Sequence, residues 1–226
     1  MALSRLAIEG IGMTSQRTRD RMILRLREQG IQNEALLAVM RKLPRHLFMD
    51  QALATRSYED TALPIGHGQT ISQPYIVARM TELLLASEHP LEKVLEVGTG
   101  SGYQAAILGK LIAKVYSVER IQALHKQARA LLDELAYRNI RTSLSDGSWG
   151  LAYEAPFDGI IVTAAPAEIP QALLEQLAVG ARLIIPTGKQ GEVQVLKVVT
   201  RTNETDYQEQ VIESVQFVPL VRSERL

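Results

Sequence analysis

Apolar side chains recur at helical spacing in three segments of the first 90 residues. These segments cover 14–29, 33–43 and 75–86, and each predicts a helix. Between the second and the third, the stretch 58–74 is interrupted by prolines and glycines and carries few strong helix formers. The first part of the chain therefore predicts a helical region that contains one ordered loop.

After residue 90 the pattern changes to short apolar segments that alternate with helical ones. Strands are predicted at 93–97, 114–118, 140–144, 157–162 and 182–186, and helices at 103–112, 121–137 and 169–177. This alternation is typical of a doubly wound parallel sheet. The apolar segments 193–199 and 211–219 lie too close together for a crossover helix, so they predict an antiparallel terminal hairpin. We expect one α/β domain over 1–226, with a helical cover and loop at 1–90 and a Rossmann-like core at 91–226.

Composition narrows the classes of protein to which the chain can belong. Lysine plus arginine number 25 and aspartate plus glutamate also 25, so the basic excess typical of nucleic-acid binders is missing. There is no cysteine, which excludes disulfides, thiolate metal sites and a cysteine nucleophile. The four histidines have no metal-ligand spacing, and no metal is expected. The sequence has no apolar run of 18 residues and no signal-peptide pattern, so we expect a cytoplasmic protein that does not bind membranes.

The strongest local signal is a glycine-rich loop between the first predicted strand of the sheet and the helix after it. The loop reads Glu96, Val97, Gly98, Thr99, Gly100, Ser101 and Gly102. Alternate glycines let the backbone approach a ligand closely, and the following helix offers free N–H groups. Dinucleotide-binding folds place the third glycine one position later, so this spacing favours S-adenosylmethionine over NAD. A tight turn with no ligand is the alternative reading.

Acidic residues end the next two predicted strands. Glu119 has about the offset at which an acidic side chain accepts hydrogen bonds from ribose hydroxyls, although a solvated charge at a helix start would look the same. Asp146 and Gly147 end the third strand, where a carboxylate could accept the adenine amino group and where an Asp-Gly turn is the alternative. Because ligands of open α/β sheets bind at the carboxyl ends of strands, the three strand ends together predict a cofactor site.

The segment after the fourth predicted strand limits the substrate. It reads Thr163, Ala164, Ala165 and Pro166, where the amino-methylating nucleic-acid enzymes resemble one another in carrying Asn/Asp-Pro-Pro-aromatic. A base amine is therefore not expected as the substrate. Methylation at a pyrimidine carbon usually needs a cysteine nucleophile, which the chain lacks. Small-molecule and protein substrates both stay open.

Five segments carry a resemblance to one family. They are 62–66 (Ala-Leu-Pro-Ile-Gly), 70–74 (Thr-Ile-Ser-Gln-Pro), the glycine loop, 146–147 (Asp-Gly) and 217–220 (Phe-Val-Pro-Leu). Together they look like protein-L-isoaspartate O-methyltransferase over nearly the whole chain. The Ser-Gln-Pro and Val-Pro-Leu segments are specific to that family, whereas the glycine loop is shared more widely. Ser145 departs from the pattern, which has glycine before Asp-Gly, and this weakens the assignment of Asp146 to adenine.

The resemblance implies a class I methyltransferase sheet and a repair enzyme. Its substrates would be isoaspartyl-containing proteins and peptides, with L-isoaspartyl residues preferred over D-aspartyl ones. S-adenosylmethionine would donate the methyl group and leave as S-adenosylhomocysteine. The methyl ester would collapse to a succinimide, whose hydrolysis returns part of the material to normal aspartate. A monomer that binds no nucleic acid is expected.

Matching by motif also assigns roles to individual residues. Ser72 is the family's active-site serine, Glu119 the ribose ligand, and Asp146 with Gly147 the adenine contacts. The residues expected to bind the cofactor also include those of the loop, namely Glu96, Gly98, Thr99, Gly100, Ser101 and Gly102. The residues expected to border the peptide and the methyl donor are Ile65, Gly66, Thr70 and Val218. The backbone of 218–220 could further pair with an extended peptide.

The expected methyl transfer depends on how the two reactants are positioned and does not need a general base. A carboxylate is already ionised at neutral pH, so we expect the Ser72 hydroxyl to donate a hydrogen bond to one carboxylate oxygen and leave the other aimed at the methyl group. A serine that caps the helix at 75–86 is the alternative for Ser72. For the whole chain, a methyltransferase of another substrate class and an S-adenosylmethionine-binding regulator without turnover both stay open, and an NAD oxidoreductase is a poorer third.

Overall fold

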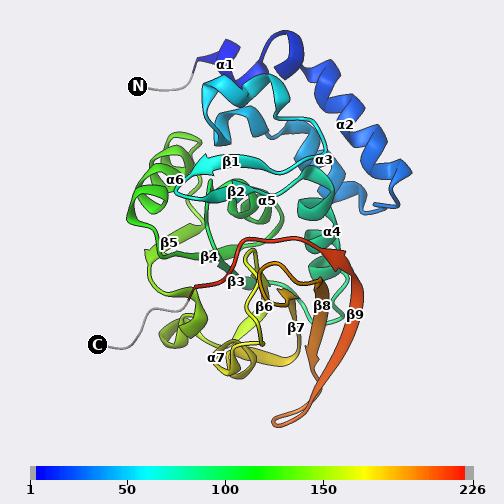
Figure 1. Ribbon diagram of the computed structural model, residues 1–226, viewed down its shortest axis with the longest axis vertical. Helices are drawn as coiled ribbons and strands as arrows, with labels where there is room; N and C mark the ends of the chain where they lie inside the picture. The colour runs from blue at the N-terminus through cyan, green and yellow to red at the C-terminus, as the bar shows by residue number, and fades with distance from the viewer. Residues whose placement is uncertain (1–3, 222–226) are drawn as a thin grey trace.

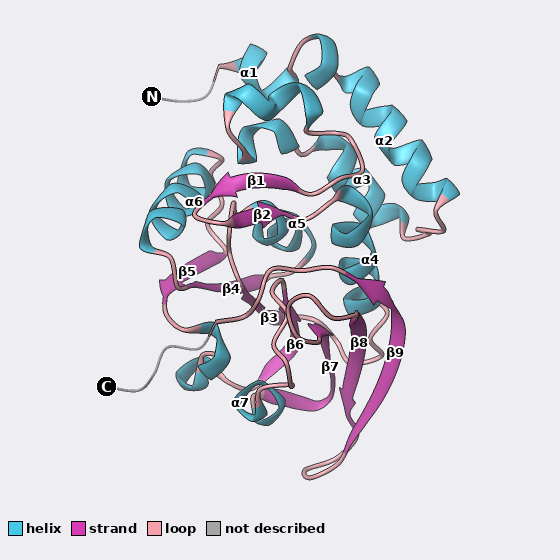
Figure 2. Ribbon diagram, in the orientation of Figure 1, coloured by secondary structure: helices cyan, strands magenta, loops and turns pink. Residues whose placement is uncertain are grey.

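The computed structural model describes residues 4–221, and Figures 1 and 2 show the arrangement of its elements. The helices are α1 (Arg5–Glu9), η1 (Gly12–Thr14), α2 (Gln16–Glu28), α3 (Glu34–Lys42), η2 (Arg45–Phe48), η3 (Gln51–Arg56), α4 (Pro74–Leu85), α5 (Tyr103–Leu111), α6 (Gln122–Glu134), η4 (Gly147–Trp149), η5 (Ala152–Glu154) and α7 (Gln171–Glu175). The strands are β1 (Leu63–Gly66), β2 (Gln69–Ile71), β3 (Lys93–Val97), β4 (Lys114–Glu119), β5 (Ile140–Leu144), β6 (Phe157–Val162), β7 (Leu177–Thr187), β8 (Gln194–Arg201) and β9 (Tyr207–Val215). The first helices gather at one end of the molecule, and the β8–β9 hairpin projects at the other (Figure 2).

A seven-stranded sheet in the order β5-β4-β3-β6-β7-β8-β9 forms the centre of the molecule. The strands from β5 to β7 in this order are parallel, and β8 and β9 pair antiparallel at one edge. This confirms the predicted α/β sheet and its terminal hairpin. The chain runs from β3 through β4 to β5 and then returns to β6 on the other side of β3. The carboxyl ends of β3 and β6 therefore lie at the point where the winding direction reverses, which is where open sheets bind ligands.

The segment predicted as a loop at 58–74 contains a short β-hairpin that the sequence analysis missed. Leu63 pairs with Ile71, and Gly66 pairs with Gln69, so two residues form the turn. Both turn residues have positive φ, 55° at His67 and 69° at Gly68. This is the conformation of a type I′ turn, which matches the twist of a two-residue hairpin.

The largest differences from the predicted boundaries are at α7 with β7, at α6 and at β9. The helix expected at 169–177 is only the short α7, because Leu177 already pairs with Phe157 and begins an eleven-residue strand. Helix α6 ends at Glu134 rather than at 137, and Ala136 just beyond it has a φ of 60°, outside the helical region. Strand β9 begins and ends four residues earlier than the expected 211–219, so the segment 216–221 is free to cross the sheet's ligand-binding edge.

Hydrophobic clusters fill both faces of the sheet. Successive strand residues point to opposite faces, and Val94 and Leu95 of β3 accordingly belong to different clusters. A third cluster joins the cover to the core, because Leu26 of α2 and Met40 of α3 pack with Tyr103 of α5. The cover and the core therefore share part of their apolar interior. Within residues 4–221, no helix is long and apolar enough to cross a membrane.

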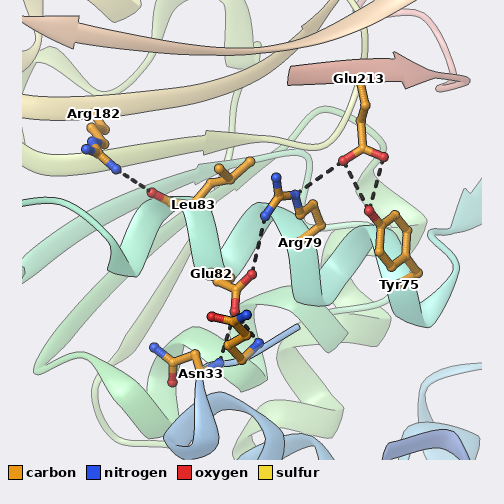
Figure 3. A network of polar contacts seen from close by, with 8 residues as sticks. Asn33, Tyr75, Arg79, Glu82, Leu83, Arg182 and Glu213 are labelled. Carbon is orange, nitrogen blue, oxygen red and sulfur yellow. Dashed lines mark hydrogen bonds and ion pairs between the residues drawn. The ribbon is translucent and has the colours of Figure 1, made fainter. Parts of the chain in front are cut away.

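Helix α4 is fixed on two flanks by a polar network (Figure 3). On one flank, Glu82 accepts a hydrogen bond from the backbone amide of Asn33 at 2.9 Å. On the other, Arg79 Nε and the Tyr75 hydroxyl both donate to the Glu213 carboxylate at 3.3 Å. Arg79 Nη1 also lies 3.4 Å from Glu82 Oε2. The network ties α4 to the cover and to β9, and it thereby fixes the start of the helix.

Candidate functional site

A cavity lies at the carboxyl ends of β3, β4 and β6, and we call it the central cavity. Its lining comes from segments 69–72, 97–101, 118–121, 163–164 and 218–221, together with Val77, Met80, Tyr103, Gln104 and Gly147. Residues from the cover, the sheet and the C-terminal segment therefore meet in one place. Six of the nine residues expected to bind the cofactor are in this lining, namely Gly98, Thr99, Gly100, Ser101, Glu119 and Gly147.

The glycine loop crosses the end of β4. The amides of Gly98 and Thr99 both donate to the carbonyl of Val118, at 2.9 and 3.1 Å. Gly98 has a φ of 96°, and a Cβ there would lie 2.4 Å from Thr163 Oγ1. Glycine is therefore required at this position by the backbone conformation and by the close packing of the loop against the end of β6.

Gly102 ends the loop with a φ of 86°, in the left-handed region, and is the N-cap of α5. A Cβ on Gly102 would lie 3.3 Å from Ala128 Cβ of α6. Gly102 is absent from the lining of the central cavity. Its position is explained by packing between α5 and α6, and its contact with the cofactor stays a prediction.

Glu119 ends β4 with its carboxylate in the cavity wall. Oε2 accepts a hydrogen bond from the Gly100 amide at 2.8 Å, and Oε1 accepts one from the Ile121 amide at 2.9 Å. The residue is only 6% exposed, so its orientation is fixed by these two bonds. Each carboxylate oxygen can accept a second hydrogen bond. Glu119 can therefore receive hydroxyl groups of a ligand while it holds the loop.

Glu96 lies behind the loop and does not line the central cavity. It is fully buried and accepts a short hydrogen bond from the Ser117 hydroxyl, which in turn lies 2.5 Å from Thr99 Oγ1. Burial, with a smaller effect from the nearby charge of Glu119, raises the pKa of Glu96 to about 8. The carboxyl group thus supports the loop from below, and the expected direct contact of Glu96 with the cofactor stays a prediction.

The two residues of the Asp-Gly pair after β5 have different positions, because only Gly147 lines the central cavity. Asp146 Oδ1 accepts a hydrogen bond from the Ser148 amide at 2.9 Å, so Asp146 acts as the N-cap of η4. Gly147 lines the cavity, and a Cβ on it would lie 2.3 Å from Val97 Cγ1. The turn alternative accounts for the observed bond of Asp146, and its contact with adenine stays a prediction.

Thr70 and Ser72 bring the cover into the central cavity. The N-cap of α4 is Gln73, which makes no side-chain capping bond. The Tyr75 amide instead donates its hydrogen bond to Asp60 Oδ1, at 2.9 Å. The capping alternative for Ser72 is therefore wrong, and within residues 4–221 its hydroxyl makes no hydrogen bond.

Ile65 and Gly66 do not line the central cavity but a side groove next to it. The side groove lies between η2, η3, β1 and α6, and it also contains Gly100 and Ser101 of the glycine loop. An ideal Cβ on Gly100 would lie 3.4 Å from Ile65 Cδ1. The two residues are thus adjacent to the cofactor loop on its outer side, and their contact with a peptide stays a prediction.

Val218 lines the cavity in a segment that is held from two sides. The Val218 carbonyl accepts a hydrogen bond from the Ala165 amide, and the Leu220 amide donates to the Ala165 carbonyl, both at 2.8 Å. The side chain of Gln194 binds the amide and the carbonyl of Phe217, at 2.6 and 3.2 Å. Two backbone groups of 218–220 are therefore already bonded to Ala165, and the pairing of the other backbone groups with a peptide stays a prediction.

The sequence analysis gave no site role to three residues that shape the cavity. Thr163 Oγ1 donates to the Gly98 carbonyl at 2.7 Å, Gln194 holds the C-terminal segment, and Arg45 donates to the carbonyl of Ser72 at 2.7 Å. Each acts on backbone far away in the sequence. The one available signal was the single charge of Arg45 between a proline and an apolar segment.

The central cavity combines two chemical capacities. Glu119 and the glycine loop form a polar wall that accepts hydroxyl groups, and the following helix adds the positive end of its dipole. Ser72, which precedes the sheet in the chain, and Val218, which follows it, border the same space. A nucleoside ligand on the first wall would lie against a second ligand at Ser72. In residues 4–221, no group of three or more His, Asp or Glu side chains is placed to hold a metal ion.

Comparisons with known proteins agree with this arrangement. The sequence profile of the family "Protein-L-isoaspartate(D-aspartate) O-methyltransferase (PCMT)" matches residues 17–225. Relatives named protein-L-isoaspartate O-methyltransferase include one from Pseudomonas paraeruginosa, 60% identical over 92% of this chain and 98% of the relative, and one from Methylobacillus flagellatus, 55% identical over 97% and 98%. The crystal structure of a Plasmodium falciparum beta-aspartate methyltransferase (PCMT) in complex with S-adenosyl-L-homocysteine superimposes with a TM-score of 0.78, at 25% identity over 91% of this chain and 99% of that one. The chain belongs to the protein-L-isoaspartate(D-aspartate) O-methyltransferase family.

Proposed function

We propose that this protein transfers a methyl group from S-adenosylmethionine to the free carboxylate of L-isoaspartyl, and of D-aspartyl, residues in damaged proteins. The observation that carries the proposal is the meeting of Ser72 and Val218 with the glycine loop in one cavity, in a chain whose family match covers residues 17–225. The product ester collapses to a succinimide, which begins the repair.

The cavity fits the cofactor by the chemistry of its donors and acceptors. Glu119 keeps free acceptor positions for the ribose hydroxyls, while its bonds to the amides of Gly100 and Ile121 fix the carboxylate. The glycine loop, with positive φ at Gly98 and Gly100, brings backbone rather than side chains to the cavity. When bound, S-adenosylmethionine supplies an electrophilic methyl group on a positively charged sulfur.

The protein's part in the reaction is to position an acceptor that is already reactive. An isoaspartyl carboxylate is ionised at neutral pH, so no general base is needed. The Ser72 hydroxyl, which makes no hydrogen bond within residues 4–221, is available to donate to one carboxylate oxygen and leave the other for attack. Fixing two reactants in this way can lower a barrier by about 7–11 kcal/mol.

The decisive experiment compares two peptides that differ in one linkage. The full chain is incubated with methyl-labelled S-adenosylmethionine and either an isoaspartyl peptide or its normal aspartyl twin. We expect label only in the isoaspartyl peptide. Equal labelling of both peptides would support a methyltransferase of another substrate class, and tight cofactor binding without transfer would support a regulator.

Ser72→Ala tests the proposed role of the hydroxyl. Losing a hydrogen bond to a charged group costs about 1.5–3 kcal/mol, so kcat/KM for the isoaspartyl peptide should fall roughly ten- to a hundredfold. Ser143→Ala is the matched control, because Ser143 is also half-buried but lies on the edge strand β5. An unchanged kcat/KM in Ser72→Ala removes this serine from the mechanism.

Three further properties stay predictions from the sequence. These are a cytoplasmic location, a monomeric state and the lack of nucleic-acid binding. The balanced charge of 25 basic and 25 acidic side chains supports the last of them.

A further inference from the structure

Arg45 is the most unusual charged residue near the central cavity, because its side chain is fully buried. Its Nε donates to the carbonyl of Ser57 at 2.8 Å, and its Nη2 donates to the carbonyl of Ser72 at 2.7 Å. The guanidinium carbon lies 4.8 Å from the centroid of the Tyr103 ring, in cation–π geometry. Arg45 therefore contacts both the segment that carries Ser72 and the residue that follows the glycine loop.

Within residues 4–221, no carboxylate forms an ion pair with this buried charge. Burial lowers the pKa of the guanidinium, and the more distant charge of Asp60 opposes only part of that effect. Burying a cation without an acidic partner costs free energy, and an apolar side chain of similar size would fill the same space without that cost. Unlike an apolar side chain, the guanidinium supplies two directed hydrogen-bond donors, one for each of two backbone carbonyls.

One of those donors acts on the carbonyl of Ser72, which lies between the β2 residue Ile71 and the N-cap residue Gln73 of α4. The hydroxyl of Ser72 itself anchors nothing within residues 4–221. The Tyr103 ring is held in place by its surroundings, because it is buried and packs edge-on against the Phe48 ring, with 5.3 Å between the two centroids. Arg45 thus joins the backbone carbonyl of Ser72 to a buried ring that directly follows the cofactor loop.

We propose that Arg45 is a positioning residue for methyl transfer, which sets the Ser72 hydroxyl against the methyl donor by holding the Ser72 carbonyl to the Tyr103 ring. The proposal rests on the proposed function. It concerns orientation of the acceptor carboxylate and not cofactor affinity, because the contacts of Glu119 with the glycine loop do not involve Arg45.

Arg45→Met removes the donors and keeps most of the volume. We expect kcat for the isoaspartyl peptide to fall roughly tenfold or more, and the Kd for S-adenosylmethionine to stay within about threefold of its original value. Arg19→Met is the matched control. Arg19 is also buried, and it donates to the carbonyls of Glu9 at 2.9 Å and Lys42 at 3.2 Å, none of which lines the cavity. Equal losses of kcat in the two variants would overturn the proposal.

A double-mutant cycle separates positioning from general support of the fold. If Arg45 acts through Ser72, then Arg45→Met should cost little further activity in the Ser72→Ala background. Losses that multiply would show that Arg45 acts independently of Ser72, and the inference would be wrong. Arg45→Lys should restore part of the lost kcat, because an ammonium group can still donate to a carbonyl.

Two controls keep the outcomes distinct. If Arg45→Met does not fold, as judged by circular dichroism, the same cycle is run with Arg45→Lys and the same criterion. If the unmodified chain fails to methylate an isoaspartyl peptide, the proposed function itself has failed. A chain that is active and slowed by Ser72→Ala, but in which the Arg45 and Ser72 losses multiply, fails only the present inference.

Discussion

Replacing Glu96 with glutamine should make the protein's stability less dependent on pH. Glu96 is fully buried beneath the glycine loop and accepts a hydrogen bond from the Ser117 hydroxyl. Burial raises its pKa from the ordinary 4.5 to about 8, so the carboxyl group keeps its proton at neutral pH. Glutamine has nearly the same shape as the protonated acid but cannot ionise. The variant therefore reproduces the buried neutral state at every pH.

The sign and the size of the effect follow from proton linkage. Between pH 4.5 and 8 the unfolded chain has lost this proton while the native protein retains it, so the free energy of unfolding falls as the pH rises. The contribution is fully present below pH 4.5 and is lost by about pH 8. At about 1.4 kcal/mol for each pH unit, the whole range amounts to about 5 kcal/mol, and the interval from pH 5.5 to 8 to about 3 kcal/mol.

Urea unfolding at several pH values between 5.5 and 8 measures this directly. The stability of Glu96→Gln relative to the unmodified protein should rise by about 3 kcal/mol across that interval, whatever its offset at the lowest pH. Glu92→Gln is the control, because Glu92 is exposed at the start of β3 and the substitution removes the same charge. If the stability difference for Glu96→Gln did not change with pH, Glu96 would titrate normally and the account of its burial would be refuted.

Two further substitutions test the walls of the cavity. Gly98→Ala places a Cβ 2.4 Å from Thr163 Oγ1 at a φ of 96°, so it should weaken S-adenosylmethionine binding at least tenfold in calorimetric titration and lower the unfolding temperature. Normal affinity in this variant would mean that the loop can shift freely. Gln194→Ala removes both bonds to the Phe217 backbone, so KM for the isoaspartyl peptide should rise several-fold while cofactor affinity is unchanged, and an equal loss of both would contradict that separation.

The sheet could be predicted from the sequence because its central strands are buried on both faces. Segments 93–97 and 157–162 are predicted and observed with identical limits, since their apolar runs end at sharp turns. The edge strand 140–144 also has the predicted limits, although its residues are only partly buried or exposed. The β1–β2 hairpin was missed because its strands have only four and three residues and one of them contains Pro64. Its turn residue His67 also has positive φ, which is uncommon for a residue other than glycine.

The cofactor side of the site was predictable for a similar reason. Glu119 ends β4, which pairs with β3, and Gly147 follows β5, which pairs with β4. The carboxyl ends of parallel strands necessarily meet at one edge of the sheet. The details around them were not predictable. Asp146 caps η4 and Glu96 supports the loop from behind, and both arrangements depend on side-chain directions that strand ends alone do not fix.

The substrate side is assembled in a different way, and this is why sequence reasoning reached it only through the resemblance to a family. Arg45 lies 27 residues before the Ser72 carbonyl that it holds, and Gln194 lies 23 residues before the Phe217 backbone that it fixes. In both cases a buried side chain bonds to a backbone group, which has no residue-specific signature. The cofactor wall is thus a property of the parallel sheet itself. The substrate wall depends on a small number of buried side chains, so single substitutions at those side chains should change peptide turnover before they change cofactor binding.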